Sequence, residues 1–253
     1  MSEIAPIRVL LAGESWSSYG IHVKGASAYT TTQYEEGAAP LIAAMEDHGC
    51  SVTYLPNHQA VEQFPYTAGE LREAYDVVIL SDLPADSLLL PHAVFVGGER
   101  RPDRLAALAE YVSAGGGLLM VGGYMSFAGF DGKARYGATA LAPVLPVQVA
   151  RHDDRAEIPQ GVVPRIGGAH TVLNGLSESW PYLLGYNVTV AREDAQVLLW
   201  AGEDPLLALR PHGAGRAGAF TSDCAPHWGS PEFMQWESYG RFWGQLVAWL
   251  AAR

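Results

Sequence analysis

The chain has 253 residues, of which 49% are hydrophobic and 17% charged, enough for one well-packed core or two small ones. Its net charge of −11 and the scatter of its sixteen basic residues argue against a nucleic-acid partner, because phosphate binding requires clustered Lys and Arg. The sequence has no run of 18 apolar residues, so no membrane-spanning segment is expected. The presence of only two cysteines, Cys50 and Cys224, indicates a reducing, cytoplasmic location.

Strands alternate with helices over the first half of the chain. Buried strands are predicted at 7–12, 52–55, 75–80 and 117–121, and helices at about 35–48 and 102–115. This alternation predicts an α/β fold with a doubly wound, mostly parallel sheet. Residues 13–37 show no clear period. A segment of that length inside a compact domain is expected to be a functional loop.

The second half of the chain begins irregularly. Residues from about 127 to 182 lack periodicity and are rich in Pro and Gly, so they are expected to form an excursion packed on the main domain. The apolar stripe over 239–250 predicts a core helix. We therefore expect one domain over 1–253. Extra C-terminal strands are predicted at 187–191, 196–200, 206–210 and 217–221.

Clusters of polar residues follow several of the predicted strands. The segment 221–228, Thr-Ser-Asp-Cys-Ala-Pro-His-Trp, directly follows the apolar run 217–220. In open α/β sheets, ligands bind at the carboxyl ends of the strands. We therefore expect loops from several strand ends to meet over one pocket that holds a small-molecule ligand.

Several segments together resemble a known family. They are Gly13–Trp16, Tyr34–Ala38, Gly115–Ser126, Leu184–Asn187 and Ser222–Pro231. These segments resemble the glutamine amidotransferase-like family of bacterial cytoplasmic proteins, which is related to class I glutamine amidotransferases and to ThuA-like proteins. The resemblance covers nearly the whole chain and implies a flavodoxin-like sheet.

The resemblance does not imply glutaminase activity. Class I amidotransferases carry a nucleophilic Cys in a Gly-x-Cys-x-Gly elbow, whereas this chain reads Gly-Gly-Tyr-Met-Ser over 122–126. Tyr124 thus replaces the thiol, and a phenol with a pKa near about 10 is a poor acyl nucleophile. His227 takes the place of the family's histidine, but Gly229 stands where the acid is expected.

The predicted catalytic residues are His227, Glu14, Glu35, Tyr124 and Cys224. His227 would move a proton, and Glu14 or Glu35 would orient it or act as a second acid or base. Tyr124 would hydrogen-bond the substrate, and the backbone N–H groups of 122–125 would bind an oxyanion. Cys224 is either a relocated nucleophile or a small buried residue. Substrate-binding residues are expected at Trp16, His22, Lys24, His58, Asp82, Gly123, Tyr186, Asn187, Asp223 and Trp228.

Three functions are compatible with these residues. The first is an enzyme that catalyses hydrolysis or proton transfer at a carbonyl-type or sugar-like centre of a small polar metabolite. The second is a non-catalytic binding or assembly protein whose pocket is filled by its own aromatic side chains. The third is a metal-dependent hydrolase, although no motif requires a cofactor. Its divalent ion would be held by His22, His58, Asp82, Asp223 and His227.

Two further expectations concern the surface. Asp153, Asp154 and Arg155 lie in the excursion and are expected to be exposed, with Asp154 and Arg155 as an alternative lid over the pocket. The acidic balance of the chain favours solubility and does not point to a substrate. A homo-oligomer is compatible with the sequence.

Overall fold

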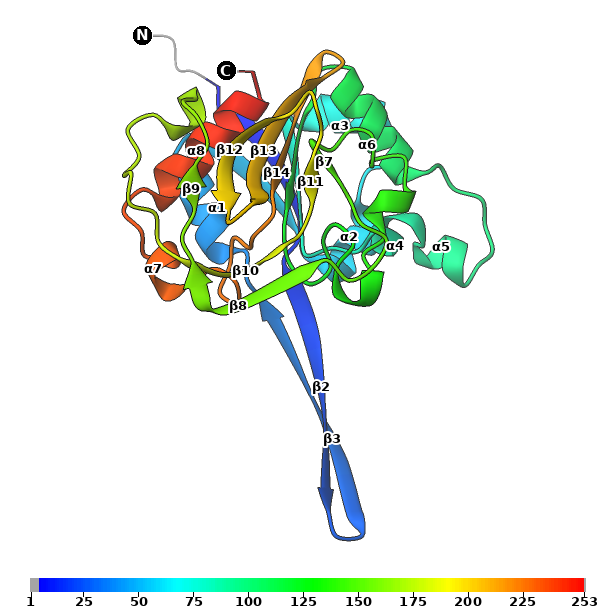
Figure 1. Ribbon diagram of the computed structural model, residues 1–253. Coiled ribbons are helices and arrows are strands. Elements are labelled where there is room, and N and C mark those ends of the chain that lie inside the picture. The colour runs from blue at the N-terminus through cyan, green and yellow to red at the C-terminus, as the bar shows by residue number, and fades with distance from the viewer. Residues whose placement is uncertain (1–4, 253) are drawn as a thin grey trace.

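A computed structural model of the chain describes residues 5–252 and is built on an eight-stranded sheet in the order β4-β1-β5-β6-β14-β13-β12-β9 (Figure 1). Pairing is parallel from β4 to β14 and antiparallel from β14 to β9. The predicted α/β, flavodoxin-like fold is confirmed. The strands are β1 (Ile7–Gly13), β4 (Cys50–Leu55), β5 (Val77–Ser81), β6 (Gly117–Val121), β9 (Arg165–Ile166), β12 (Gln196–Ala201), β13 (Asp204–His212) and β14 (Gly215–Phe220).

Helices cover both faces of this sheet, which explains why the central strands are apolar without alternation. In β5, for example, Ile79 packs into the core beneath α1 and α8, and its neighbour Leu80 packs into the core on the other face. No helix of residues 5–252 has the length and apolar character needed to cross a bilayer. The helices are α1 (Ala39–Glu46) and α8 (Tyr239–Leu250) on one face, α2 (Asn57–Gln63), α3 (Ala68–Ala74), α4 (Ala85–Leu89) and α6 (Arg104–Ser113) on the other, and the short α5 (His92–Phe95) and α7 (Pro231–Met234).

The segment after β6 contains short elements that pack on the sheet. Phe127 and Tyr136 are fully buried in the core on the α6 side. The prediction of one strand over 187–191 is wrong. One strand ends at Asn187 and another begins at Val190, and the two pair with different neighbouring strands. The elements are η1 (Phe130–Gly132), η2 (Tyr136–Ala138), β7 (Val147–Gln148), β8 (Arg155–Val162), η3 (Thr171–Leu173), β10 (Leu183–Asn187) and β11 (Val190–Ala191).

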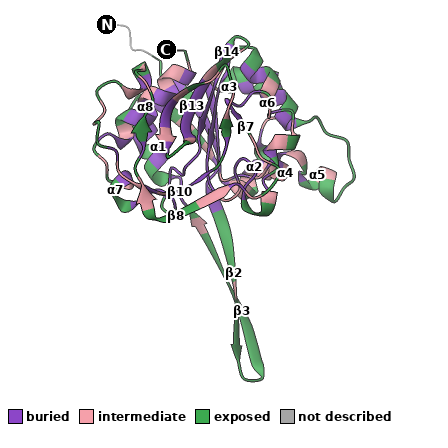
Figure 2. Cartoon of the chain, in the orientation of Figure 1, coloured by how far each residue is buried: buried purple, intermediate pink, exposed green. Residues whose placement is uncertain are grey.

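The predicted loop over 13–37 is instead a long β-hairpin, which we call the arm. Strands β2 (Ser15–Lys24) and β3 (Ser27–Glu36) pair in register along their whole length, and a two-residue turn begins at Gly25, which has a φ of +59°. The arm projects from the body (Figure 1), and almost all of its residues are exposed (Figure 2). Its strands escaped prediction because Ser, Thr and Gly separate their larger residues and no core-facing apolar run results.

Candidate functional site

A cavity of about 610 Å³ lies at the carboxyl ends of parallel strands that are neighbours in the sheet. Glu14 follows β1, Asp82 follows β5, Tyr124 follows β6 and His227 follows β14. The expected convergence of loops from distant parts of the chain is therefore present. The residues that line the cavity are Glu14, Trp16, Asp82, Tyr124, Met125, Phe130, Lys133, Asp223, Pro226 and His227.

Three carboxyl groups meet at the base of this cavity. Burial raises the pKa of Glu14 well above its usual value, and repulsion from Asp223 and Asp82 adds to the effect. Burial also raises the pKa of Asp223 well above its usual value, with a contribution from Asp82. The pKa of Asp82 is raised by burial, an effect that the Met125 N–H and His227 oppose. The neutral form of Glu14 is therefore favoured.

Glu14 is held in a strained and crowded position. Its φ is +50°, and its Oε2 accepts hydrogen bonds from Ser81 Oγ at 2.6 Å and from Cys224 Sγ at 3.7 Å. A Cβ atom on Gly37 would lie 2.7 Å from Glu14 Oε1 and 3.0 Å from the Ala225 Cβ, so a larger residue there would push the Glu14 side chain out of its position. Asp82 and His227 also have positive φ angles. Backbone strain of this kind concentrates at functional sites.

His227 presents its imidazole to the cavity with a carboxylate behind it. Its Nδ1 lies 3.6 Å from Oδ2 of the buried Asp223, whose Oδ1 accepts a hydrogen bond from the Ala225 N–H. The ring packs edge-on to Tyr124 at a centroid distance of 4.4 Å and stacks on Trp228 at 5.3 Å. The side chain is 40% exposed. An imidazole that is fixed on one side and open on the other can act as a general acid or base.

Three of the backbone N–H groups that were predicted to bind an oxyanion, in the turn over 122–126, already have hydrogen-bond partners. Gly122 N–H bonds backbone carbonyls, Gly123 N–H donates to Asn187 Oδ1 at 3.1 Å, and Met125 N–H donates to Asp82 Oδ1. These donors are therefore already used. Burial and the neighbouring Glu157 also raise the pKa of Tyr124, which makes its phenol a still weaker nucleophile.

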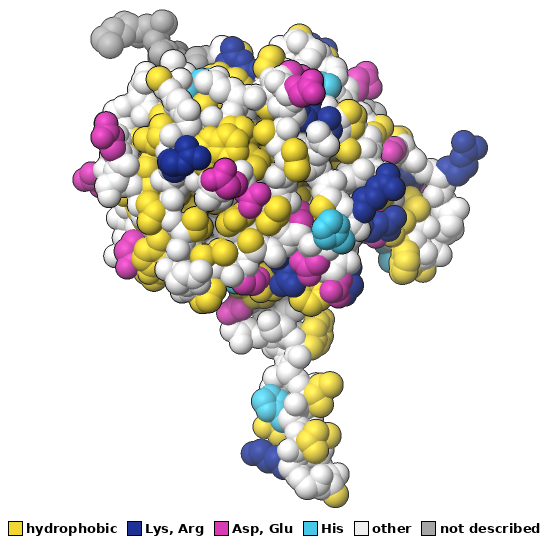
Figure 3. All heavy atoms as spheres, in the orientation of Figure 1, with side chains coloured by type: hydrophobic (Ala, Val, Ile, Leu, Met, Phe, Trp, Pro, Cys, Tyr) yellow, Lys and Arg dark blue, Asp and Glu magenta, His cyan; other side chains and the backbone are white. Residues whose placement is uncertain are grey.

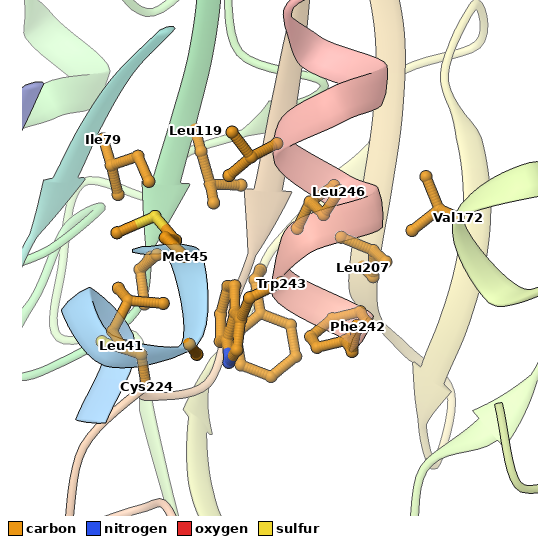
Figure 4. Close-up of a cluster of buried hydrophobic side chains, with 14 of the residues drawn as sticks. Leu41, Met45, Ile79, Leu119, Val172, Leu207, Cys224, Phe242, Trp243 and Leu246 are labelled. Carbon is orange, nitrogen blue, oxygen red and sulfur yellow. The ribbon is translucent and has the colours of Figure 1, made fainter. Parts of the chain in front are cut away.

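Cys224 lies in the core, as the alternative of a small buried residue predicts. Figure 4 shows its side chain among hydrophobic neighbours that include Leu41 and Trp243. Burial raises its thiol pKa well above the usual value, and the charges of Glu14 and Asp223 add to the effect. A reactive thiolate needs the opposite surroundings, so the prediction of a relocated nucleophile is wrong.

The arm carries two predicted ligand-binding residues away from the cavity. His22 stacks on Tyr29 at 4.7 Å, and Lys24 ends β2 at the tip of the arm. His22 is seven residues along β2 from Ser15, a distance of about 23 Å at the rise of an extended strand. The prediction that His22 and Lys24 line the pocket is therefore wrong.

Three other predicted residues lie close to the cavity but outside its lining. Glu35 accepts a hydrogen bond from the Trp16 indole at 2.7 Å and so orients a side chain of the cavity wall. His58 packs edge-on to Tyr34 beside a neighbouring groove. Tyr186 does not line the cavity, and its hydroxyl donates to Asp204 at 3.0 Å.

Behind the cavity, buried polar residues hold its walls. Asn187 Nδ2 donates to the Gly123 carbonyl at 3.2 Å and to Asp154 Oδ1 at 2.9 Å. The expectation that Asp154 is exposed is wrong, because its carboxylate also accepts the N–H groups of residues 128 and 129. Trp228 is buried, and its indole donates to Glu157 at 3.1 Å.

One wall of the cavity comes from the excursion. The Arg155 guanidinium lies 4.4 Å from the ring centre of Tyr124 and 4.2 Å from that of Phe130, and it pairs with Asp153 at 2.9 Å. Arg155 thus supports aromatic side chains and does not act as a lid. Phe130 and Lys133 were not predicted, because they lie where the sequence shows no periodicity.

The predicted metal-ligand set is not brought together, since His22 and His58 lie outside the cavity. Within residues 5–252, ligand-type atoms of Glu14, Asp223 and Cys224 lie within 4.8 Å of one another. Zinc-type ions bind the thiolate, and the raised pKa of the Cys224 thiol opposes its formation. The second function predicted a cavity filled by its own aromatic side chains, which differs from the open 610 Å³ found.

Comparisons with known proteins agree with the fold. The chain matches a family model described as "Putative glutamine amidotransferase" over residues 8–252. The cytoplasmic proteins STM3548 and STM1381 from Salmonella typhimurium each have 42% identity and a TM-score of 0.92. The alignments cover 96% of this chain and 98% and 99% of theirs. The cytoplasmic location expected from the cysteine content is confirmed by these relatives.

More distant structures share the fold alone. A ThuA-like protein from Parabacteroides merdae has 13% identity and a TM-score of 0.54, with 97% of this chain and 90% of that protein covered. Among curated proteins, none matches the chain. The match over 8–252 confirms the resemblance drawn from the sequence, and the chain belongs to the glutamine amidotransferase-like (GATase1-like) family.

Proposed function

We propose that this protein is an enzyme that transfers protons at the carbonyl centre of a small, hydroxylated metabolite. The observation that carries the proposal is the presence of two different acid–base groups on one cavity. Glu14 is buried among other acids, which favours its protonated form, and His227 is backed by Asp223. Paired groups whose surroundings push their pKa values apart are typical of acid–base catalysis.

His227 and Glu14 each carry out one of the two proton transfers. His227 accepts a proton from the carbon next to the carbonyl, and Glu14 donates its proton to the carbonyl oxygen, so that an enediol forms. Asp223 orients the imidazole, because its Oδ2 lies 3.6 Å from Nδ1. His227 then gives its proton to the neighbouring carbon while Glu14 takes a proton from the other enediol hydroxyl, which completes an isomerisation and restores both residues. Reversal of the first step after His227 has exchanged its proton with solvent gives exchange at the original carbon.

Proton transfer is favoured over hydrolysis for two reasons. Acyl transfer needs a nucleophile, and Cys224 is buried with a raised pKa. It also needs free N–H donors for the oxyanion, and those of Gly123 and Met125 are already bonded.

The walls of the cavity support a sugar-like substrate. Trp16, Tyr124 and Phe130 offer aromatic faces that can pack against the C–H groups of a polyol or a sugar. Lys133 lies at the same cavity, but its Nζ pairs with Asp131 at 3.0 Å, so an anionic group on the substrate is not required.

The test uses deuterium exchange. The purified protein is incubated in D₂O with a panel of aldoses, ketoses and hydroxyketones, and each compound is analysed by mass spectrometry. We expect deuterium to enter at carbon in one chemical class. His227→Gln and Glu14→Gln should each slow this exchange by about 100-fold or more, because each removes a proton-transfer group.

Tyr186→Phe is the matched control, because its hydroxyl bonds Asp204 away from the cavity lining. It should retain the exchange rate of the unmodified protein. Absence of exchange across the panel with the unmodified protein would contradict the proposal, as would an unchanged rate in His227→Gln.

A further inference from the structure

Between residues 17 and 34 the arm has one face without charged side chains, and Glu36 lies on the same side only at the base, where it accepts a hydrogen bond from the Tyr34 hydroxyl at 2.7 Å. Residues paired across a two-stranded ribbon lie on the same side of it, and the register pairs Tyr19 with Thr32, Ile21 with Thr30 and Val23 with Ala28. We call this side the apolar face of the arm. It consists of Ser17, Tyr19, Ile21, Val23, Ala28, Thr30, Thr32 and Tyr34.

The opposite face of the arm is polar. It carries His22, Lys24 and Glu35, and contacts along it follow the same register. Examples are the stacking of His22 on Tyr29 and the hydrogen bond from Trp16 to Glu35. Figure 3 shows hydrophobic side chains mainly along one side of the arm, with a histidine and a basic side chain on the other. The arm is thus amphipathic although solvent surrounds it.

The exposed apolar side chains make the arm less stable in water unless another surface covers the apolar face. Tyr19, Ile21 and Val23 are 76%, 75% and 69% exposed. A lone two-stranded hairpin is at best marginally stable in water, and contiguous exposed apolar surface marks an interaction site. In the described part of the chain, no element of the body covers this face. The expected cover is another molecule.

We infer that the apolar face of the arm docks on the same face of a second copy of this chain. Each copy carries a net charge of −11, so two copies can approach closely only through a surface free of charge. A charged peptide or a nucleic acid would need complementary charges along the arm, and the apolar face has none between residues 17 and 34. A face that pairs with itself produces a closed two-fold dimer.

In this dimer the two arms run antiparallel. The two-fold axis passes beside Gly20, which lies at the middle of β2. The tip of each arm, at Val23, then reaches the base of the partner's arm. A groove of about 390 Å³ lies at this base, lined by Trp16, Tyr34 and His58 among others. Tyr34 belongs to the apolar face, so the face continues into the groove.

The groove adds contact area that the ribbons need. A ten-residue strand spans about 33 Å, and a ribbon of two strands is about 10 Å wide. The face of each ribbon therefore measures only about 330 Å². Stable dimers bury roughly 1,200–2,000 Å² in total, so insertion of both tips into both grooves is part of the interface. Trp16 lines both the groove and the catalytic cavity, so the partner's tip lies beside that cavity.

The test is sedimentation velocity on the full chain and two matched variants. The unmodified protein should sediment at twice the 27.2 kDa of one chain. Thr30→Lys places a charge on the apolar face and should produce monomers. Thr31→Lys makes the same change one residue further on the polar face, and the dimer should persist. Circular dichroism checks that both variants are folded.

A double variant, Ser17→Cys with Val23→Cys, tests the antiparallel arrangement. These residues lie about 20 Å apart on one arm, too far for a disulfide within the chain, and the native cysteines are buried. Mild oxidation should therefore give a covalent dimer. A monomeric unmodified protein, equal effects of Thr30→Lys and Thr31→Lys, or failure of this cross-link would overturn the inference.

Discussion

Replacement of Asn187 by Ala tests whether side chains hold the turn over 122–126 closed. Asn187 accepts the Gly123 N–H at 3.1 Å, and it donates to the Gly123 carbonyl at 3.2 Å and to Asp154 at 2.9 Å. All three residues are buried. An orphaned buried N–H costs about 1–3 kcal/mol, and a lost hydrogen bond to a charged group costs about 1.5–3 kcal/mol. We therefore expect the free energy of unfolding to fall by about 3–5 kcal/mol.

The assay is urea unfolding at neutral pH, followed by tryptophan fluorescence. For a chain of this size, the same loss lowers the melting temperature by about 10 °C. Asn174→Ala is the control, because Asn174 is exposed and should change stability by less than about 0.5 kcal/mol. A loss below about 1 kcal/mol for Asn187→Ala would refute the reasoning and leave the Gly123 N–H available for a ligand.

The remaining predictions concern the base of the cavity. The pKa of Glu14 is raised in the folded protein, so its stabilising contribution is present below its usual value of 4.5 and is lost as the pH rises. Glu14→Gln should therefore be more stable than the unmodified protein at pH 8, as measured by thermal unfolding. That advantage should shrink toward pH 4.5, and a pH-independent difference would contradict the assignment. Cys224 and Cys50 should resist a thiol reagent in the folded state and react once urea unfolds the chain, because both are buried. Gly37→Ala should lower stability by about 1–3 kcal/mol through a clash with Glu14, and unchanged stability would contradict the crowding described there.

The sheet could be predicted from the sequence because both of its faces are buried. Continuous apolar runs such as 117–121, bounded by glycines, are typical of strands that are buried on both faces. The arm could not be predicted in the same way. Ser and Thr stand among its larger residues and obscure the alternation, and no part of residues 5–252 covers its apolar face.

The sequence predicted those cavity residues that directly follow a strand. It did not place some other residues correctly. Glu14, Asp82 and His227 need only the topology of the sheet to reach one cavity. His22 was misplaced because the regular pairing of β2 and β3 carries it outward. Phe130 reaches the cavity through turns that show no periodicity, so the sequence contained no signal for it.

The protonation state of Glu14 is the most direct test of the proposed acid–base pair. Its side-chain carboxyl carbon can be followed by ¹³C NMR from pH 3 to pH 9, with Glu14→Gln to assign the signal. The account predicts that the carboxyl group is still protonated at neutral pH and titrates well above 4.5. A carboxyl group that is ionised at pH 5 and titrates near 4.5 would contradict it and would remove the proposed acid from the cavity.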